Sequence, residues 1–457
     1  RLTVLLFMLG YGLVTIPSVL YSGSIAVLRL FDVPQLFDLP YSQALTLTIV
    51  MIGSTGALYA VFGGLKAIAV SDTLNGMGLL LIGLAVPLLG LSALGDGSIG
   101  DGLHIVANTH TEKLNAVGGP SDPTPFATLF TGMIFANLFY WCTNQYVIQR
   151  TLAAKNLAEG QKGVLFSGFF KVLVPFIMMI PGVIAFHLYG PVGSEGGLPS
   201  IDLAYPQLIR DVLPTYAMGF FLAVLLGAVF SSFNSLLNSA ATLFCLDIYL
   251  PFKKRQSGVV VNDKQLVTVA KRASVVIALF SFVVAPLLQF APEGLWQIIR
   301  IFTGFYNIPV IAIVIVGLFT RRVPALAAKL AIVFHVVAYG LLKFVFDDWV
   351  TIHFLHLYAI LFVIEVAMML VIGQLYPRRQ AWTFVRSDKI DLQRWRYAVP
   401  CAVTLASSVV GLYLLFSPIG LVDGISVAFW PLILTLVGIN ILVWWNAARQ
   451  EFALVKS

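Results

Sequence analysis

Long apolar segments recur along almost the whole of this 457-residue chain, and they constrain its fold more than any other feature. Hydrophobic residues make up 59% of the sequence and charged residues only 11%. A helix needs about 20 apolar residues to cross a bilayer, where backbone groups find no water to bond. The sequence therefore predicts an all-α polytopic membrane protein.

We place twelve membrane spans on these apolar runs. They cover residues 3–29, 42–63, 73–94, 126–148, 164–189, 215–248, 268–290, 295–319, 323–345, 352–376, 397–417 and 425–446. Lys and Arg gather in every second connection, whereas the other connections are rich in Asp and Glu. By the positive-inside rule, this alternation predicts that both termini of this chain lie in the cytoplasm.

The charges and the cysteines exclude several classes of protein. The net charge of +7 comes from the connections, so it reflects topology and indicates no nucleic-acid partner. Cys142, Cys245 and Cys401 fall in or beside apolar runs, which argues against a disulfide framework. The sequence shows no catalytic triad, zinc-ligand spacing or phosphate-binding loop, so we expect neither an enzyme nor a cofactor.

The sixth span carries an unusual number of small polar side chains in the segment GAVFSSFNSLLNSAATLF, residues 227–244. The spacing i, i+4, i+7 and i+11 places one set on a single helical stripe: Ser231, Ser235, Asn238 and Thr242. One interpretation is close helix packing. The other is a sodium site, since Ser231, Ser232 and the carbonyl of Ala228 offer oxygens, the ligands that a hard cation prefers.

Two further features are candidates for ligand binding. The fourth span places the amide of Asn137 and the ring of Tyr140 near other amides and rings, which suits a polyhydroxylated ligand or interfacial anchoring. Lys171 and Arg300 lie within predicted spans. A cation there indicates a functional role, with snorkelling to the membrane surface as the alternative.

Three stretches resemble the sodium/solute symporter family: LYAVFGGLKAIAVSD (58–72), NLFYWCTNQYVIQRTLAAKNLAEGQKG (137–163) and SSFNSLLNSAATLFCLDIY (231–249). The resemblance runs from about residue 10 to residue 320. It is strongest to the sugar branch, the bacterial sodium/galactose symporters and animal sodium/glucose cotransporters.

The resemblance implies a LeuT-like transporter core of two inverted five-helix repeats. Residues 1–94 would form the remainder of the first repeat with three spans, and 95–125 an extracytoplasmic loop. Residues 126–320 would form the second repeat, and 321–457 four peripheral spans with a short cytoplasmic tail. The leading helices of the first repeat are not in this chain, so we expect residues to precede Arg1.

The resemblance also assigns a sodium site. It makes the carbonyl of Ala228 and the hydroxyls of Ser231 and Ser232 the sodium ligands of this half of the site. Asp72 would lie on the route by which sodium leaves towards the cytoplasm.

For the solute, the resemblance makes Asn137 and Lys171 hydrogen-bond partners of the sugar and Tyr140 the inner gate ring beneath it. Trp296 stands where an outer-gate aromatic is expected. Arg300 replaces the glutamine that contacts sugar in the family. A guanidinium can bind a carboxylate through two hydrogen bonds, which admits acidic sugars, unless Arg300 points outward towards water.

We therefore predict a plasma (inner) membrane symporter that imports a sugar with sodium by alternating access. The sugar is a hexose or a related sugar, acidic sugars included. Its partners are the sodium ion as co-substrate, the small-molecule sugar and the lipid bilayer. The alternatives are a sodium symporter for a carboxylate, nucleobase or vitamin and, less favoured, a transporter-like solute sensor.

Overall fold

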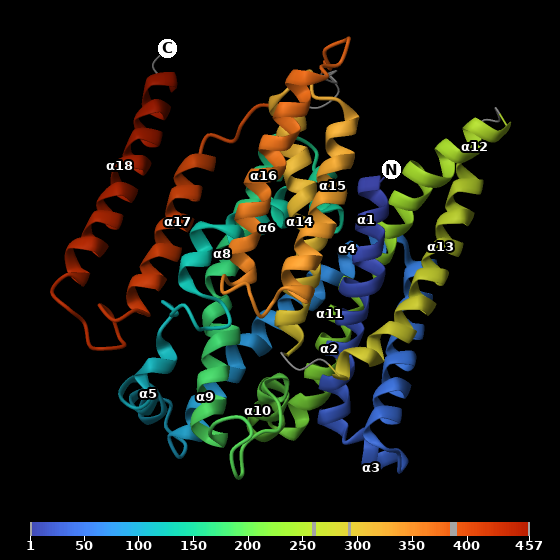
Figure 1. Cartoon of the computed structure of the whole chain (residues 1–457). Helices are drawn as coiled ribbons and strands as arrows, with labels where there is room; N and C mark the ends of the chain where they lie inside the picture. Colours follow the sequence, from blue (N-terminus) through green and yellow to red (C-terminus); the bar gives the residue numbers. More distant parts are fainter. Residues whose placement is uncertain (1, 258–261, 291–293, 384–390, 456–457) are drawn as a thin grey trace. The chain divides into compact units, whose positions relative to one another are not determined.

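The computed structural model describes residues 2–257, 262–290, 294–383 and 391–455, and every regular element in these ranges is a helix (Figure 1). Within these described ranges, eleven helical stretches are long and apolar enough to cross a membrane, and each overlaps one of the predicted spans. The predicted all-α membrane protein is therefore confirmed. Its helices fall into two compact units, which we describe separately.

Unit 1 comprises Arg1–Ile82, Thr128–Val147 and Pro199–Phe384. The first span is one helical stretch with a π-helical turn, α1 (Leu2–Gly10), η1 (Tyr11–Thr15) and α2 (Ile16–Phe31). The other elements are α3 (Val33–Phe37), most of α4 (Tyr41–Leu94), α6 (Gly132–Cys142), η5 (Ile201–Leu203), α10 (Ala204–Val212), α11 (Thr215–Leu243), η6 (Phe244–Tyr249), α12 (Leu250–Ser257), α13 (Asp263–Val284), η7 (Ala285–Phe290), α14 (Leu295–Phe319), α15 (Ala325–Gly340), η8 (Leu341–Val345) and α16 (Phe354–Leu375).

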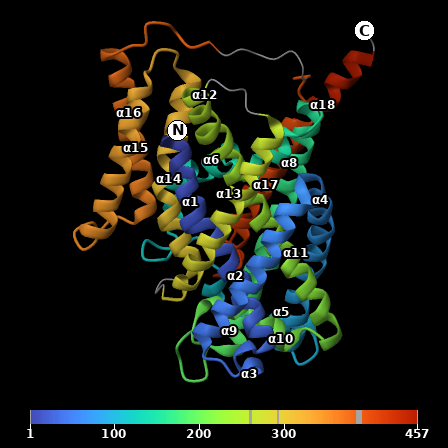
Figure 2. The ribbon, with the colours of Figure 1, turned by 90° about the vertical axis from the view of Figure 1, so that its right-hand side faces the viewer.

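Two helix groups build unit 1. Helices α14, α15 and α16 pack against one another, and α6 packs against α14 and α16. Helices α2, α11 and α13 form the second group (Figure 2). Close approach depends on small residues, since the backbone at Gly304 lies against the ring of Tyr358 and that at Gly23 lies against Val229.

Unit 2 comprises Gly83–Ala127, Ile148–Leu198 and Val385–Ser457. Its elements are the end of α4, α5 (Ile99–Asn108), η2 (Thr111–Leu114), α8 (Leu157–Val172), η4 (Pro175–Met179), α9 (Ile180–Tyr189), α17 (Ala398–Leu415) and α18 (Phe429–Val455). Helix α17 packs against α8 and α18. The predicted outer loop 95–125 contains the short helix α5. The two units group residues that lie in contact, and they do not test the predicted inverted repeats. The division of the chain into two repeats therefore stays a prediction.

The prediction of one continuous span over residues 126–148 is wrong. The structure has three short helices there, η3 (Phe126–Phe130), α6 and α7 (Gln145–Leu152), separated near Thr131 and Thr143. At the second break, the backbone N–H groups of Thr143 and Asn144 both donate to the carbonyl of Phe139, each at 3.0 Å. The side-chain amide oxygen of Asn144 accepts a hydrogen bond from the Tyr11 hydroxyl. Asn144 thus has a side-chain partner from the first span at the point where α6 ends.

Candidate functional site

Helix α6 carries two of the predicted sugar-binding side chains one turn apart. Asn137 is exposed, and its Nδ2 donates to the carbonyl of Met133 at 2.9 Å. Tyr140 is partly buried, and its hydroxyl shares a 2.6 Å hydrogen bond with the Tyr146 hydroxyl. Because α6 is only 11 residues long and ends at a break, it is the kind of discontinuous helix that lines solute sites in secondary transporters.

Tyrosines from other elements hold this short helix in place. Tyr11 in the π-helical turn η1 is fully buried and donates to Asn144 at the break. Its ring meets that of Tyr146 edge to face, with centres 6.2 Å apart. Sequence reasoning missed Tyr11 and Tyr146. A hydroxyl inside an apolar run is the signal that could have identified Tyr11, since buried hydroxyls usually have a hydrogen-bond partner.

Arg300 on α14 contacts the same helix. Its Nη2 lies against the Met133 thioether, one turn before Asn137, and its guanidinium carbon is 5.6 Å from the centre of the Trp296 ring. The Arg300 side chain therefore lies between α14 and α6, and the outward orientation admitted by the sequence is not observed. Trp296 itself is 67% exposed, and its outer-gate role stays a prediction.

Side chains from α15 and α16 bind the backbone of α14 close to Arg300. The Tyr358 hydroxyl donates to the Arg300 carbonyl, and the Tyr339 hydroxyl donates to the Ile301 carbonyl at 3.0 Å. One turn on, His335 Nε2 donates to the Gly304 carbonyl at 3.1 Å. Glu365 binds the other nitrogen of His335, and neither side chain is exposed. These contacts fix the segment from which Arg300 projects.

The candidate sodium ligands lie on the unbroken helix α11. Ala228, Ser231 and Ser232 are partly buried. Most hydroxyls in the spans donate to a carbonyl one turn earlier, as Ser235 does to the carbonyl of Ser231 at 2.7 Å. Within the described residues, the hydroxyls of Ser231 and Ser232 make no such bond, so their oxygens remain available as ligands for a hard cation.

Polar groups of α4 lie beside this part of α11. The side-chain amide of Asn75 contacts the backbone at Gly227, next to Ala228. Asp72 precedes Asn75 by one helical turn and is partly buried. The structure therefore places Asp72 on the face of α4 that carries the contact with α11. Its role on the sodium exit route stays a prediction.

Lys171 belongs to unit 2 and is described there only. It lies in the last turn of α8, where it is exposed, just before the π-helical turn η4. Its predicted contact with a sugar is therefore not tested by the geometry of unit 1. Taken together, unit 1 brings Asn137, Tyr140 and Arg300 to one helix, and it places the three candidate sodium ligands on another.

The comparisons with known proteins agree on one family. The profile of the sodium:solute symporter family matches residues 5–333. The uncharacterized symporter YidK of Escherichia coli (strain K12) is 43% identical over 409 residues, which are 89% of this chain and 69% of that protein. These matches confirm the resemblance on which the sequence-based predictions rest.

Other relatives are longer than this chain. The sodium/glucose cotransporter of Vibrio parahaemolyticus is 32% identical over 71% of this chain and 60% of its own length. The human sodium/myo-inositol cotransporter 2 is 32% identical over 61% of this chain and 44% of its own length. The chain thus spans less than two thirds of either protein.

The fold has a counterpart among solved structures. A Na+-coupled sialic acid symporter, in a substrate-bound outward-open state, superposes with a TM-score of 0.67 at 21% identity. The match covers 84% of this chain and 75% of the other. It confirms the predicted LeuT-like transporter fold.

Proposed function

Because the chain belongs to the sodium:solute symporter family, we propose that it couples the inward flow of sodium to the import of a sugar. Membership establishes sodium-coupled solute symport by a multi-pass membrane protein, and such proteins are not enzymes. The finer assignment, a hexose or related sugar, acidic sugars included, is our proposal for the solute.

One observation supports the sugar most directly. Asn137 exposes an amide one turn from the ring of Tyr140, and Arg300 contacts the same helix one turn before Asn137. A ring can cover the CH face of a sugar while an amide bonds its hydroxyls, because an amide both donates and accepts. The Vibrio and human relatives, named for glucose and myo-inositol, support a polyhydroxylated solute.

Arg300 favours a sugar that carries a carboxylate. A guanidinium binds a carboxylate through two parallel hydrogen bonds, and the partly buried position of Arg300 strengthens that attraction. The same feature supports the alternative solute class, a small carboxylate without a sugar ring. Nucleobases, vitamins and a sensor role gain no specific support from the arrangement.

Sodium would act through Ser231, Ser232 and the carbonyl of Ala228. Three oxygens replace part of the hydration shell of the ion, and the remaining ligands must come from another element. If bound sodium favours the sugar-competent conformation, sugar must favour sodium binding by the same factor.

We also infer a plasma (inner) membrane location, with both termini of this chain in the cytoplasm. The supporting observation is the alternation of basic and acidic connections.

Uptake into proteoliposomes tests the coupling. A labelled hexose, a uronate, a dicarboxylate and a nucleobase are each offered in sodium medium and in potassium medium. We expect sodium-dependent uptake of a sugar, with the uronate preferred. Equal sugar uptake in both media would refute the coupling, and sodium-dependent uptake of the dicarboxylate or nucleobase alone would refute the sugar.

The variant Arg300→Gln tests whether Arg300 causes the preference for the uronate over the hexose. We expect it to lower the affinity for the uronate on the order of 30-fold while leaving the hexose within about twofold. Arg300→Lys is the matched control, because it keeps the charge but loses the planar two-bond geometry.

A further inference from the structure

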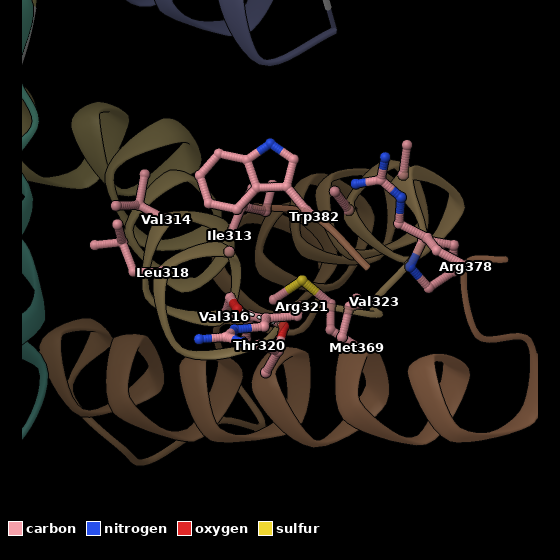
Figure 3. Close-up of a pocket in the computed structure, with 14 residues that line it drawn as sticks. Ile313, Val314, Val316, Leu318, Thr320, Arg321, Val323, Met369, Arg378 and Trp382 are labelled. Atoms are coloured by element: carbon pink, nitrogen blue, oxygen red, sulfur yellow. Dashed lines mark hydrogen bonds between the residues drawn. The ribbon is translucent and has the colours of Figure 1, made fainter. Parts of the chain in front are cut away.

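A cavity lies in unit 1, at the end of the α14–α15–α16 group and apart from the candidate sugar-binding residues on α6 (Figure 3). Its volume is about 410 Å³. The apolar wall includes Ile313, Val316 and Met369, and the polar groups are Thr320, Arg321 and Arg378. Figure 3 shows the indole of Trp382 on one side of the cavity and Thr320 with Arg321 on the other.

The chain builds this cavity by folding back on itself. After α16, the backbone N–H of Arg378 donates to the carbonyl of Arg322 at 2.8 Å, and that of Trp382 donates to the carbonyl of Arg321 at 2.9 Å. The segment 378–382 is thereby fixed over the turn between α14 and α15. The positions of Arg378 and Trp382 therefore follow from main-chain bonds.

The described residues that line the cavity include Arg321 and Arg378 but no Asp or Glu. The flanking segments 313–329 and 366–383 add Arg322, Lys329 and Arg379 and likewise contain no Asp or Glu. Within the described part of the chain, neither Arg321 nor Arg378 forms an ion pair. The first turn of α15 also lines the cavity, and no side chain caps it, so its free N–H groups add positive potential.

The apolar part of the cavity adjoins exposed apolar side chains at the end of α14. Leu318 is 64% exposed and Phe319 is 83% exposed at the end of a membrane span. An occupant must therefore carry an anion at one end and hydrocarbon at the other. A free phosphate ion meets only the first requirement.

We propose that this cavity binds an anionic glycerophospholipid. Its phosphodiester lies between Arg321 and Arg378 near the start of α15, and an acyl chain follows Ile313, Val316 and Leu318 along α14. Trp382 lies at the headgroup level, where amphipathic rings favour the membrane interface. The arginines belong to connections that the sequence predicts to be cytoplasmic, the side on which basic pockets between spans meet anionic headgroups. This site is separate from the proposed sugar and sodium sites.

Trp382 serves as the reporter in the test. The complete protein is reconstituted into bilayers containing brominated phosphatidylglycerol or brominated phosphatidylcholine, since bromine quenches a tryptophan that it contacts. The Trp382→Phe variant is measured in parallel, and the difference isolates the signal of Trp382. We expect half-maximal quenching at a mole fraction of phosphatidylglycerol roughly 30-fold lower than for phosphatidylcholine, from two arginines.

Two double variants test whether the preference for phosphatidylglycerol over phosphatidylcholine arises in this cavity. Arg321→Gln with Arg378→Gln should remove the preference for phosphatidylglycerol. Arg322→Gln with Arg379→Gln, which removes equal charge from residues that do not line the cavity, should keep it. If the first double variant does not fold, the comparison of the two lipids on the unmodified protein still decides the question.

Three outcomes would overturn the proposal. Equal quenching by the two lipids contradicts an anionic ligand. A preference that persists in the Arg321→Gln, Arg378→Gln variant contradicts this location. Loss of the preference on addition of millimolar inorganic phosphate, at constant ionic strength, identifies a site for a free anion instead of a lipid.

Discussion

Helices α11 and α6 both carry candidate ligand groups inside the membrane, but they present them in different ways. Helix α11 runs unbroken for 29 residues, so its own geometry places Ala228, Ser231 and Ser232 on one face. Helix α6 has 11 residues and is held by Tyr11, Tyr146 and α14. The candidate ion-binding half is thus locally specified, whereas the candidate solute-binding half depends on residues distant in sequence.

This difference predicts which substitutions affect which ligand. Changes on α1, α14, α15 and α16 should alter sugar binding through the position of α6 and Arg300. Sodium binding should respond to α11 itself.

The largest effect is expected at the buried His335–Glu365 pair. Glu365→Leu leaves Nδ1 of the buried His335 without a partner and should lower the free energy of unfolding by about 3–5 kcal/mol. The double variant His335→Leu, Glu365→Leu should regain most of that loss, because two apolar side chains need no partner. Thermal unfolding in detergent measures both.

The same variants test whether sugar binding and sodium binding depend on different parts of unit 1. At a temperature where the double variant is folded, sugar affinity should fall, because His335 no longer binds the Gly304 carbonyl near Arg300. Half-saturating sodium should stay within about twofold. A change in sodium dependence as large as the change in sugar affinity would contradict the separation.

The second prediction concerns the two hydroxyls of α11. Ser231→Ala with Ser232→Ala should raise the half-saturating sodium concentration on the order of 100-fold, by analogy with loss of two bonds to a charged group. Ser235→Ala is the matched control, since its hydroxyl already bonds the Ser231 carbonyl. Sodium-dependent uptake measures both, and equal effects in the two variants would rule out the proposed ligands.

A smaller effect is expected at the break between α6 and α7. Tyr11→Phe removes the donor to Asn144 and should weaken sugar binding about fivefold, the cost of one unsatisfied buried acceptor. Tyr21→Phe is the control, because Tyr21 is also buried in the first span but has no hydrogen bond to another described residue. Equal losses in the two variants would show that the break needs no such support.

The smallest effect concerns pH. His353, just before the α16 span, has a lowered pKa, chiefly from burial and further from His356, Arg300 and Lys343. Its Nδ1 accepts the Leu355 N–H at 3.3 Å, which requires the neutral ring. The folded state therefore binds fewer protons than the unfolded state around pH 6.5 and below.

Stability from His353 is thus present above about pH 6.5 and is lost as the pH falls towards the lowered folded-state value. The free energy of unfolding should be lower at pH 5.5 than at pH 7.5 by less than about 1 kcal/mol. This difference appears as a slightly lower unfolding temperature at pH 5.5. His353→Asn, which keeps a capping group without a titrating ring, should flatten this dependence. An unchanged slope would exclude His353 as its cause.

The sequence predicted most of the helices because apolar length alone decides whether a segment can cross a bilayer. It predicted α11 and its polar stripe because helical periodicity is local. The break near Thr143 was missed, since it involves Tyr11, 133 residues away from Asn144. A pattern within the fourth span carries no information about such a partner.

The candidate site was predictable to a similar extent. Side-chain type and family resemblance selected Asn137, Tyr140 and Arg300, but the direction of Arg300 follows from its contact with Met133 on another helix. The pair of His335 and Glu365 likewise joins two helices. The role of Lys171 stays a prediction.

The most direct test of the account is equilibrium binding of the preferred sugar at a series of sodium concentrations, with the protein held in detergent or nanodiscs. We expect sodium to tighten sugar binding by a factor of roughly 5–150, the usual range of coupling between two sites. In Ser231→Ala with Ser232→Ala, sugar affinity should become nearly independent of sodium over the same concentrations. Sugar affinity that rises with sodium equally in both proteins would contradict the claim that these hydroxyls hold the coupled ion.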